Sequence, residues 1–243
     1  MKSRLALRFA ALGYLALLLG IPVVLVFIHA FQDGIASAWD AVTTPEAQHA
    51  FYLTMVMVVV AVPLNTVFGV LCALAVVRQR FRGRALLNAM VDLPFAVSPV
   101  VVGLALLLVY GRRDGWVGEW LAERGIQVIF STPGMILATM FVSLPFVVRE
   151  VIPVLREIGT EQEQAAATLG AGAFQTFFRV TLPAIRWGVA YGVVLTTARA
   201  LGEFGAVSVV SGKLSGRTET ATLFVENRFQ RFDETGAYAA SVV

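Results

Sequence analysis

The chain has 243 residues, of which 58% are hydrophobic and only 14% are charged, and its mean hydropathy is +0.77. Soluble domains carry about 25% charged and about 45–50% apolar residues, so this composition excludes an ordinary soluble protein and favours one that lies in a membrane. The net charge of +3 comes from short clusters between apolar runs instead of one basic face, a pattern that indicates membrane topology and no nucleic-acid partner.

Long runs without charged residues predict helices that cross a membrane. A crossing helix needs about 20 predominantly apolar residues, because about 30 Å of hydrocarbon is covered at about 1.5 Å per residue. The expected spans, in chain order, are about 9–31, 50–77, 86–110, 132–153 and 187–211, with a sixth that begins at about 236. The sixth run is cut off at Val243, so we expect the natural C-terminus to lie further on. The runs predict an all-α, polytopic transmembrane helical bundle of five to six spans, organised as a single domain over 1–243.

The distribution of Lys and Arg predicts the orientation of these spans, because cytoplasmic loops are enriched in both. The loop 78–84 contains four Arg, whereas the loop 32–50 contains acidic residues and no Lys or Arg. We therefore expect a cytoplasmic N-terminus, whose tail carries Lys2, Arg4 and Arg8. The expected external loops are 32–50, 112–131 and 212–235.

The longest cytoplasmic connection, 154–183, contains signals for a helix of its own. Thr160 and Glu163 have the spacing of a capping box, which predicts a helix beginning at Glu161. Gly170 or Gly172 is expected to form its C-terminal turn. Three Phe side chains then share one helical stripe, at 174, 177 and 178. The pattern alone leaves two interpretations open, a partner-binding helix and a helix that packs beneath the bundle.

A motif within this connection carries a resemblance to a known family. Gln164-Ala165-Ala166, followed by Gly170 and then by Leu182-Pro183, resembles the EAA loop of ABC importer permeases. The resemblance implies that 161–170 is the coupling helix, which docks on a separate cytoplasmic ATPase. It assigns ATPase coupling to Glu161, Glu163, Gln164, Ala165, Ala166, Gly170, Leu182 and Pro183. Gln164 stands where the family usually has Glu, and Glu161 and Glu163 are nearby substitutes for that charge.

Two further segments narrow the resemblance. Asp92–Val101 and Ala198–Gly212 are similar to segments of sulfate/thiosulfate ABC importer permeases of the CysW type. This resemblance implies the type I permease fold in a bacterial inner membrane, with no cofactor in this chain. It implies as partners a sister permease in a heterodimer, an ATPase dimer that binds ATP and Mg, and a periplasmic or extracellular sulfate-binding protein. The Arg-x-Leu-Gly-Glu-Phe-Gly part of the second segment is also similar to molybdate and tungstate permeases, which are the alternative.

Charged residues within the spans are candidates for the translocation path. Arg199 and Glu203 are four residues apart, so they share one helix face and can pair. A lone intramembrane Arg costs about 3 kcal/mol on insertion scales, so pairing is expected whatever its use, but a guanidinium also matches an oxyanion well. Asp92 lies near the cytoplasmic end of its span, where either snorkelling to the interface or gating would explain it. Arg149 and Glu150 are interpreted as marking the cytoplasmic end of the fourth span.

Several patterns are absent from the sequence. It contains no GxxxxGK[ST] motif, so this chain is not expected to bind ATP in the P-loop manner or to be an enzyme. The single Cys72 offers no disulfide framework, and His29 and His49 are isolated, so no metal site is expected. A passive anion channel and a membrane anchor subunit are the alternatives from other classes.

Overall fold

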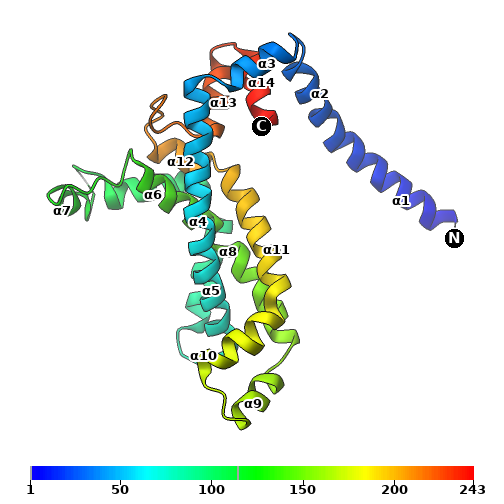
Figure 1. The fold of residues 1–243 in the computed structure, drawn as a ribbon, viewed down its shortest axis with the longest axis vertical. Helices are drawn as coiled ribbons and strands as arrows, with labels where there is room; N and C mark the ends of the chain where they lie inside the picture. Colours follow the sequence, from blue (N-terminus) through cyan, green and yellow to red (C-terminus); the bar gives the residue numbers. More distant parts are fainter. Residues whose placement is uncertain (1, 114) are drawn as a thin grey trace. The chain divides into compact units, whose positions relative to one another are not determined.

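The computed structural model describes residues 2–113 and 115–243, with side chains from Leu7 onward, and every regular element in these ranges is helical (Figure 1). The side chains of Lys2 and Arg4, which belong to the predicted cytoplasmic tail, lie outside the described residues. The helices up to residue 157 are α1 Lys2–Leu15, η1 (a π-helical turn) Ala16–Gly20, α2 Ile21–Ala30, α3 Ile35–Val42, α4 Pro45–Arg78, α5 Arg84–Ala96, α6 Pro99–Tyr110, α7 Gly118–Ala122 and α8 Thr132–Glu157. Those that follow are α9 Glu161–Thr168, α10 Ala173–Thr176, η2 Phe177–Thr181, α11 Leu182–Leu201, α12 Gly205–Val210, α13 Ala221–Gln230 and α14 Glu234–Val242.

The chain forms two compact units. The first consists of residues 1–53 and 213–243, and the second of residues 54–212. In the first unit α14 packs on α2, α3 and α13. Its core contains Ala47, Ala50, Phe224 and Ala240. The predicted organisation as a single domain over 1–243 stays a prediction.

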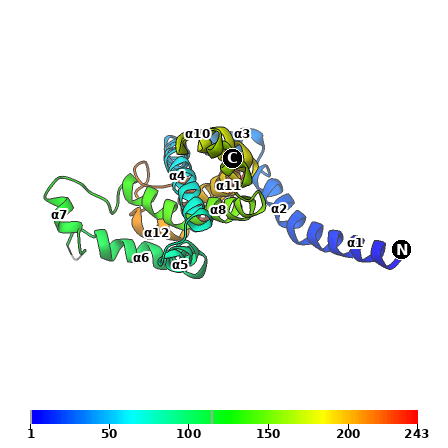
Figure 2. The same cartoon turned by 90° about the horizontal axis from the view of Figure 1, so that it is seen from below.

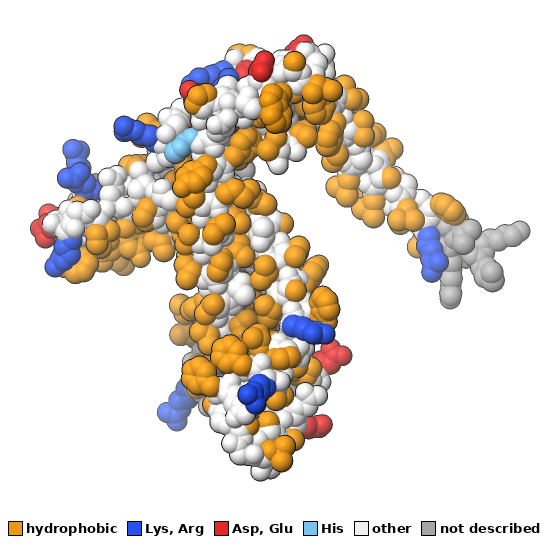
Figure 3. Space-filling view, in the orientation of Figure 1, with side chains coloured by type: hydrophobic (Ala, Val, Ile, Leu, Met, Phe, Trp, Pro, Cys, Tyr) orange, Lys and Arg blue, Asp and Glu red, His pale blue; other side chains and the backbone are white. Residues whose placement is uncertain are grey.

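Among the described residues, three helices are long and apolar enough to cross a membrane, namely Leu7–Ala30, Pro45–Arg78 and Thr132–Glu157, and the bent pair of α5 and α6 adds a fourth if it is one span. The three helices coincide with the first, second and fourth spans expected from the sequence. In the second unit α8 is central, because α5, α6, α11 and α12 all pack against it (Figures 1 and 2). The lateral surface of this unit is covered by apolar side chains, and charged side chains gather near α9 and α10 (Figure 3). Such a surface suits lipid around the helices and water at their ends.

The third expected span, 86–110, is not one helix. It consists of α5 and α6, which are bent by 115° at the break between them. Val97 and Ser98 adopt extended conformations, with ψ of 134° and 136°. Proline disfavours the α conformation of the residue before it and has no N–H to donate, so Pro99 ends α5 and starts α6. The pair is a broken span or a re-entrant loop.

The fifth expected span, 187–211, is also interrupted. α11 begins earlier than predicted, at Leu182, and ends at Leu201, and α12 starts at Gly205. The carboxylate of Glu203 accepts a hydrogen bond from the N–H of Ala206 at 2.8 Å, so it satisfies the start of α12 in the way that a capping side chain does. The sequence prediction missed this break because it treated Glu203 as a partner of Arg199 and a candidate for the translocation path, and not as a helix cap.

The contact between α8 and α11 is close because glycine lies on the α11 face. A Cβ atom on Gly192 would lie 2.9 Å from the Cα atom of Val147, and one on Gly188 would lie 3.1 Å from the carbonyl oxygen of Glu150. The two glycines form the small-xxx-small pattern that lets transmembrane backbones approach. A buried polar link holds α4 to α8 in the same unit, since the amide of Asn65 donates to the carbonyl of Met140 at 2.9 Å.

Candidate functional site: the coupling loop and the intramembrane ion pairs

The helix α9 begins at Glu161, the residue expected from the sequence, and ends at a glycine turn. Gly170 has a φ of +83°, a conformation that side chains with a Cβ rarely adopt. Its N–H donates to the carbonyl of Ala167 at 3.0 Å, and the N–H of Ala171 donates to that of Ala166 at 3.0 Å. These two bonds form a Schellman motif, which ends the helix and turns the chain towards α10.

The predicted capping box is wrong. The Thr160 side chain makes no capping hydrogen bond to α9. Instead, the Nε2 atom of Gln164 donates to the Thr160 hydroxyl at 3.1 Å. The Glu163 carboxylate does not reach back to the start of its own helix, because it pairs with a guanidinium from α4.

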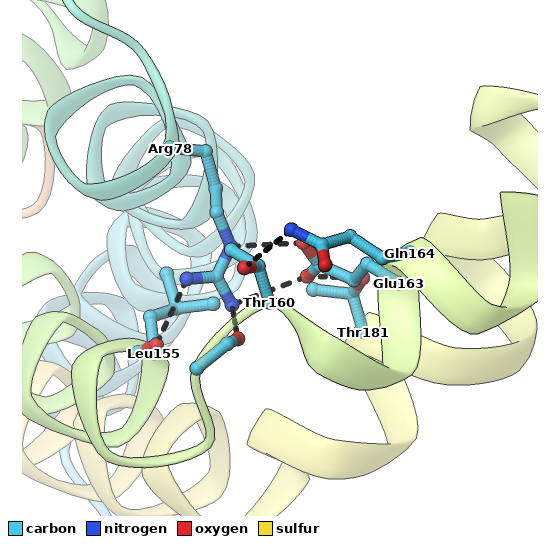
Figure 4. A network of polar contacts seen from close by, with 7 residues as sticks. Arg78, Leu155, Thr160, Glu163, Gln164 and Thr181 are labelled. Atoms are coloured by element: carbon cyan, nitrogen blue, oxygen red, sulfur yellow. Dashed lines mark hydrogen bonds and ion pairs between the residues drawn. The ribbon is translucent and has the colours of Figure 1, made fainter.

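That guanidinium belongs to Arg78, the last residue of α4 (Figure 4). Its Nε atom lies 3.0 Å from Oε2 of Glu163, and its Nη2 atom donates to Oε1 at 3.2 Å. The Thr181 hydroxyl donates to the same Oε1 at 2.9 Å. The side chains of Arg78 and Glu163 are only 16% and 21% exposed. Charge-assisted, two-point contacts of this type are among the stronger polar interactions in proteins.

Arg78 also binds the C-terminal end of α8. Its Nη1 atom donates to the carbonyl of Leu155 at 3.0 Å, and its Nη2 atom donates to that of Gly159 at 2.6 Å. The last carbonyls of a helix have no partner within it, so a cation at this end satisfies them. The sequence analysis counted Arg78 only as one of four topology charges. Its position at the last residue of a long apolar helix is the sequence signal that could have indicated this second role.

The outward face of the segment 161–178 is polar on α9 and apolar beyond it. Glu161, Gln164 and Ala165 are exposed, whereas Ala166 and Glu163 are partly buried. Two large apolar side chains are almost fully exposed to solvent, Leu169 at 88% and Phe174 at 82%. The Phe174 and Phe178 rings are stacked with their centroids 6.3 Å apart. An exposed apolar patch of this type marks a binding surface.

Leu182 and Pro183 lie at the start of α11, where proline is well tolerated because the first N–H groups of a helix have no internal partner. Leu182 packs against the buried core beneath it, and Pro183 is exposed. These two residues therefore connect the segment that contains α9 and α10 to α11.

Arg199 and Glu203 form the ion pair expected from their spacing, with 2.7 Å between Nη1 and Oε2. The Glu203 side chain is 1% exposed and the Arg199 side chain 29%. Because the second carboxylate oxygen accepts from Ala206, Glu203 connects the end of α11 to the start of α12. The pair therefore lies at the break in the fifth span.

Asp92 forms an ion pair that the sequence analysis did not predict. The Nε atom of Arg149 on α8 donates to Oδ1 of Asp92 on α5 at 2.6 Å, and Nη2 contacts the second oxygen. The interpretation of Arg149 as only a marker of the membrane boundary is wrong. Pairing with an Arg from the neighbouring helix, rather than snorkelling alone, accommodates the Asp92 charge.

An apolar cavity of about 600 Å³ lies in the expected external loop of the second unit. It is lined by residues from the end of α6 and by the segment 125–130, with Arg112 and Arg113 on its wall. Nearby, Trp116 and Trp120 are 89% and 56% exposed. No cluster of three or more potential ligands for a metal ion occurs among the described residues.

Long apolar helices, a sharply bent pair of apolar helices and ion pairs within the helical bundle are features of a polytopic membrane protein. The family model "Binding-protein-dependent transport system inner membrane component" matches residues 65–240, and the chain belongs to this family. The family places the chain among multi-pass inner-membrane permease subunits.

Three relatives narrow the comparison. "Sulfate transport system permease protein CysW" of Synechocystis sp. is 52% identical over 242 residues, covering 100% of this chain and 87% of that protein. The protein of the same name from Escherichia coli K12 is 48% identical, covering 94% of this chain and 78% of that protein. "Sulfate transport system permease protein CysT" of E. coli K12 is 41% identical, covering 96% and 84%. The resemblance to CysW-type permeases seen in the motifs is confirmed.

A solved structure shares the fold. It is described as a bacterial ABC transporter involved in the import of the acidic polysaccharide alginate, and one of its chains matches with a TM-score of 0.83. The match covers 99% of this chain and 89% of that chain at 17% sequence identity. The predicted all-α permease fold of ABC importers is therefore confirmed.

Proposed function

We propose that this chain is a transmembrane permease subunit of an ATP-driven ABC importer for sulfate and thiosulfate. The observation that carries the proposal is the 52% identity to a sulfate permease along the whole chain. Molybdate and tungstate are not favoured, because the relatives described above are sulfate permeases. The subunit itself performs no catalysis, and a separate ATPase supplies the energy.

The proposed assembly contains four kinds of subunit. This chain pairs with a sister permease, a role supported by relatives named both CysW and CysT. Two ATPase copies, which bind ATP and Mg, dock on the cytoplasmic side against α9 and the exposed Leu169 and Phe174. A sulfate-binding protein delivers the substrate from outside. A solved complex of the related alginate transporter with its periplasmic protein supports this arrangement.

The N-terminus is proposed to be cytoplasmic, with α9 on the same side of the membrane. Movement of the ATPases would then act on α9 and open the path alternately to each side. The coupling residues in this scheme are those that the resemblance assigns, namely Glu161, Glu163, Gln164, Ala165, Ala166, Gly170, Leu182 and Pro183.

Arg199 is proposed to meet the oxyanion during the cycle. A guanidinium presents paired N–H donors to a tetrahedral oxyanion, and Arg199 is partly exposed beside the break between α11 and α12. Glu203 holds the guanidinium when substrate is absent. Asp92 and Arg149 form a second pair that would rearrange as the spans move.

A paired substitution tests the role of Arg199. If Arg199 only neutralises Glu203, then Arg199→Leu with Glu203→Gln should recover much of what Arg199→Leu alone loses, because no unpaired buried charge remains. If Arg199 meets the oxyanion, the double variant should assemble, keep its ATPase activity and fail to accumulate sulfate. Near-normal uptake in the double variant would refute the substrate role.

The substrate is tested in cells that lack their own sulfate importer and are supplied with this subunit and its partners. We expect radiolabelled sulfate to accumulate, unlabelled thiosulfate to compete, and molybdate to compete poorly. Accumulation of molybdate in preference to sulfate would contradict the proposal.

A further inference from the structure

The coupling helix α9 is attached to the membrane helices through glycine joints at both ends. Gly159 precedes it with a φ of +63°, and Gly170 follows it with a φ of +83°. A Cβ built at either position would meet nothing within 4 Å, so neither joint is held by packing. Through the backbone alone, a push on α9 would be absorbed at these joints before it reached the spans.

A network of polar contacts bypasses the joints (Figure 4). Arg78 at the end of α4 binds the carboxylate of Glu163 on α9 and, at the same time, the carbonyls of Leu155 and Gly159. On the other side, Thr181 donates to the Glu163 carboxylate from the turn before α11 and is itself 4% exposed. The Glu163 carboxylate on α9 is thus bound to the end of α4 and to the turn before α11, and Arg78 links it to the end of α8.

Both charged groups of the central pair are engaged within the network. Nη1 and Nη2 of Arg78 donate hydrogen bonds, its Nε lies 3.0 Å from Oε2 of Glu163, and Oε1 of Glu163 accepts from Arg78 and Thr181. The carboxylate points inward, so it is not free for a salt bridge with an ATPase. A lysine would present one ammonium point and could not reproduce the fork.

We propose that Arg78 is a positioning residue that clamps the coupling helix to the cytoplasmic ends of α4 and α8, and that Glu163 serves this clamp instead of contacting the ATPase. Because of this clamp, α9 and the ends of α4 and α8 move as one rigid body, so a movement of α9 reaches the spans. The inference rests on the proposed function, since it concerns how the importer couples ATP hydrolysis to transport.

Hydrogen exchange tests the clamp without any transport measurement. In the purified whole complex, Arg78→Gln should raise the exchange of the α9 amides by about tenfold or more, because hydrogen bonds to charged groups each contribute on that scale. Arg80→Gln is the matched control. It removes an Arg from the same loop, and its side chain is exposed. Arg78→Lys should give an intermediate increase in the exchange of the α9 amides. This second variant keeps the test possible if Arg78→Gln fails to fold.

Coupling is measured in the same preparations as sulfate accumulated per ATP hydrolysed, alongside co-purification of the ATPase. We expect Arg78→Gln and Glu163→Gln to retain the ATPase and to lower this ratio several-fold. The double variant should be no worse than either single one, because both remove one interaction. Additive losses would show that Glu163 acts separately, and would overturn the clamp.

Different results would contradict the proposed clamp and the proposed function. If the wild-type complex takes up no sulfate while α9 exchange still rises in Arg78→Gln and not in Arg80→Gln, the function is wrong and the mechanical link stands. If uptake is normal and Arg78→Gln matches Arg80→Gln in exchange and in coupling ratio, the clamp is wrong.

Discussion

Replacing Gly192 by Val should force α8 and α11 apart. The new Cβ atom would lie 2.9 Å from the Cα atom of Val147 and 3.5 Å from the Cβ atoms of Val147 and Glu150. The nearest of these atoms is backbone, which cannot rotate away, and the two γ carbons of valine add to the crowding. The helices must therefore separate or bend.

The expected loss in the free energy of unfolding is the balance of two opposing effects. Overpacking a well-packed contact costs about 1–3 kcal/mol. The higher helix propensity of valine over glycine returns about 0.4 kcal/mol. The net loss of about 1–2.5 kcal/mol corresponds to a fall in melting temperature of about 2–10 °C, at about 2–4 °C per kcal/mol for a chain of this size.

Thermal unfolding of the purified subunit in detergent measures this effect. Gly20→Val is the matched control, because Gly20 has helical φ and ψ angles and a Cβ there would meet nothing within 4 Å. The control should melt at the wild-type temperature or slightly above it. A Gly192→Val variant that melts as the control does would refute the close packing of α8 against α11.

Three further predictions concern topology, the coupling turn and a buried amide. In a Cys72→Ala background, an impermeant thiol reagent should label Ser37→Cys in intact cells and should not label Gln79→Cys; reversed labelling would contradict the orientation. Gly170→Val should strain a turn with a φ of +83° and lower uptake per ATP while the subunit stays in the membrane; wild-type coupling would exclude a docking role for this turn. Asn65→Leu removes a fully buried donor with two acceptors on α8 and should lower the melting temperature by about 2–8 °C, from a loss of about 1–2 kcal/mol; an unchanged melting curve would count against that link.

The long spans could be predicted from sequence because lipid imposes a length and an absence of charge on any crossing helix. α4 and α8 lie where charge-free runs predicted them. The two breaks could not be placed by that criterion, because the first lies in an apolar stretch and the charge of Glu203 at the second does not by itself indicate where a helix ends. One depends on the conformation imposed before Pro99, and the other on the Glu203 carboxylate bonding to Ala206.

In the candidate site, too, local features could be predicted from the sequence and contacts between distant residues could not. The turn at Gly170 follows from local sequence, so it could be predicted, and the start of α9 at Glu161 was placed correctly although the capping box that predicted it does not form. The partners of Glu163 and Asp92 could not, because Arg78 and Arg149 are 85 and 57 residues away in the chain and meet them only in the folded bundle. The capping box failed for the same reason, since a guanidinium from another helix competed for the carboxylate.

The central claim is that this chain provides the path of an importer driven by a separate ATPase, and uptake into proteoliposomes tests it most directly. The chain is reconstituted with its sister permease and ATPase, with the binding protein and radiolabelled sulfate on the side opposite α9. The account predicts accumulation of sulfate above its outside concentration only with ATP on the α9 side, and its abolition by vanadate. Equilibration of sulfate without ATP, unaffected by vanadate, would identify a passive channel and contradict the account.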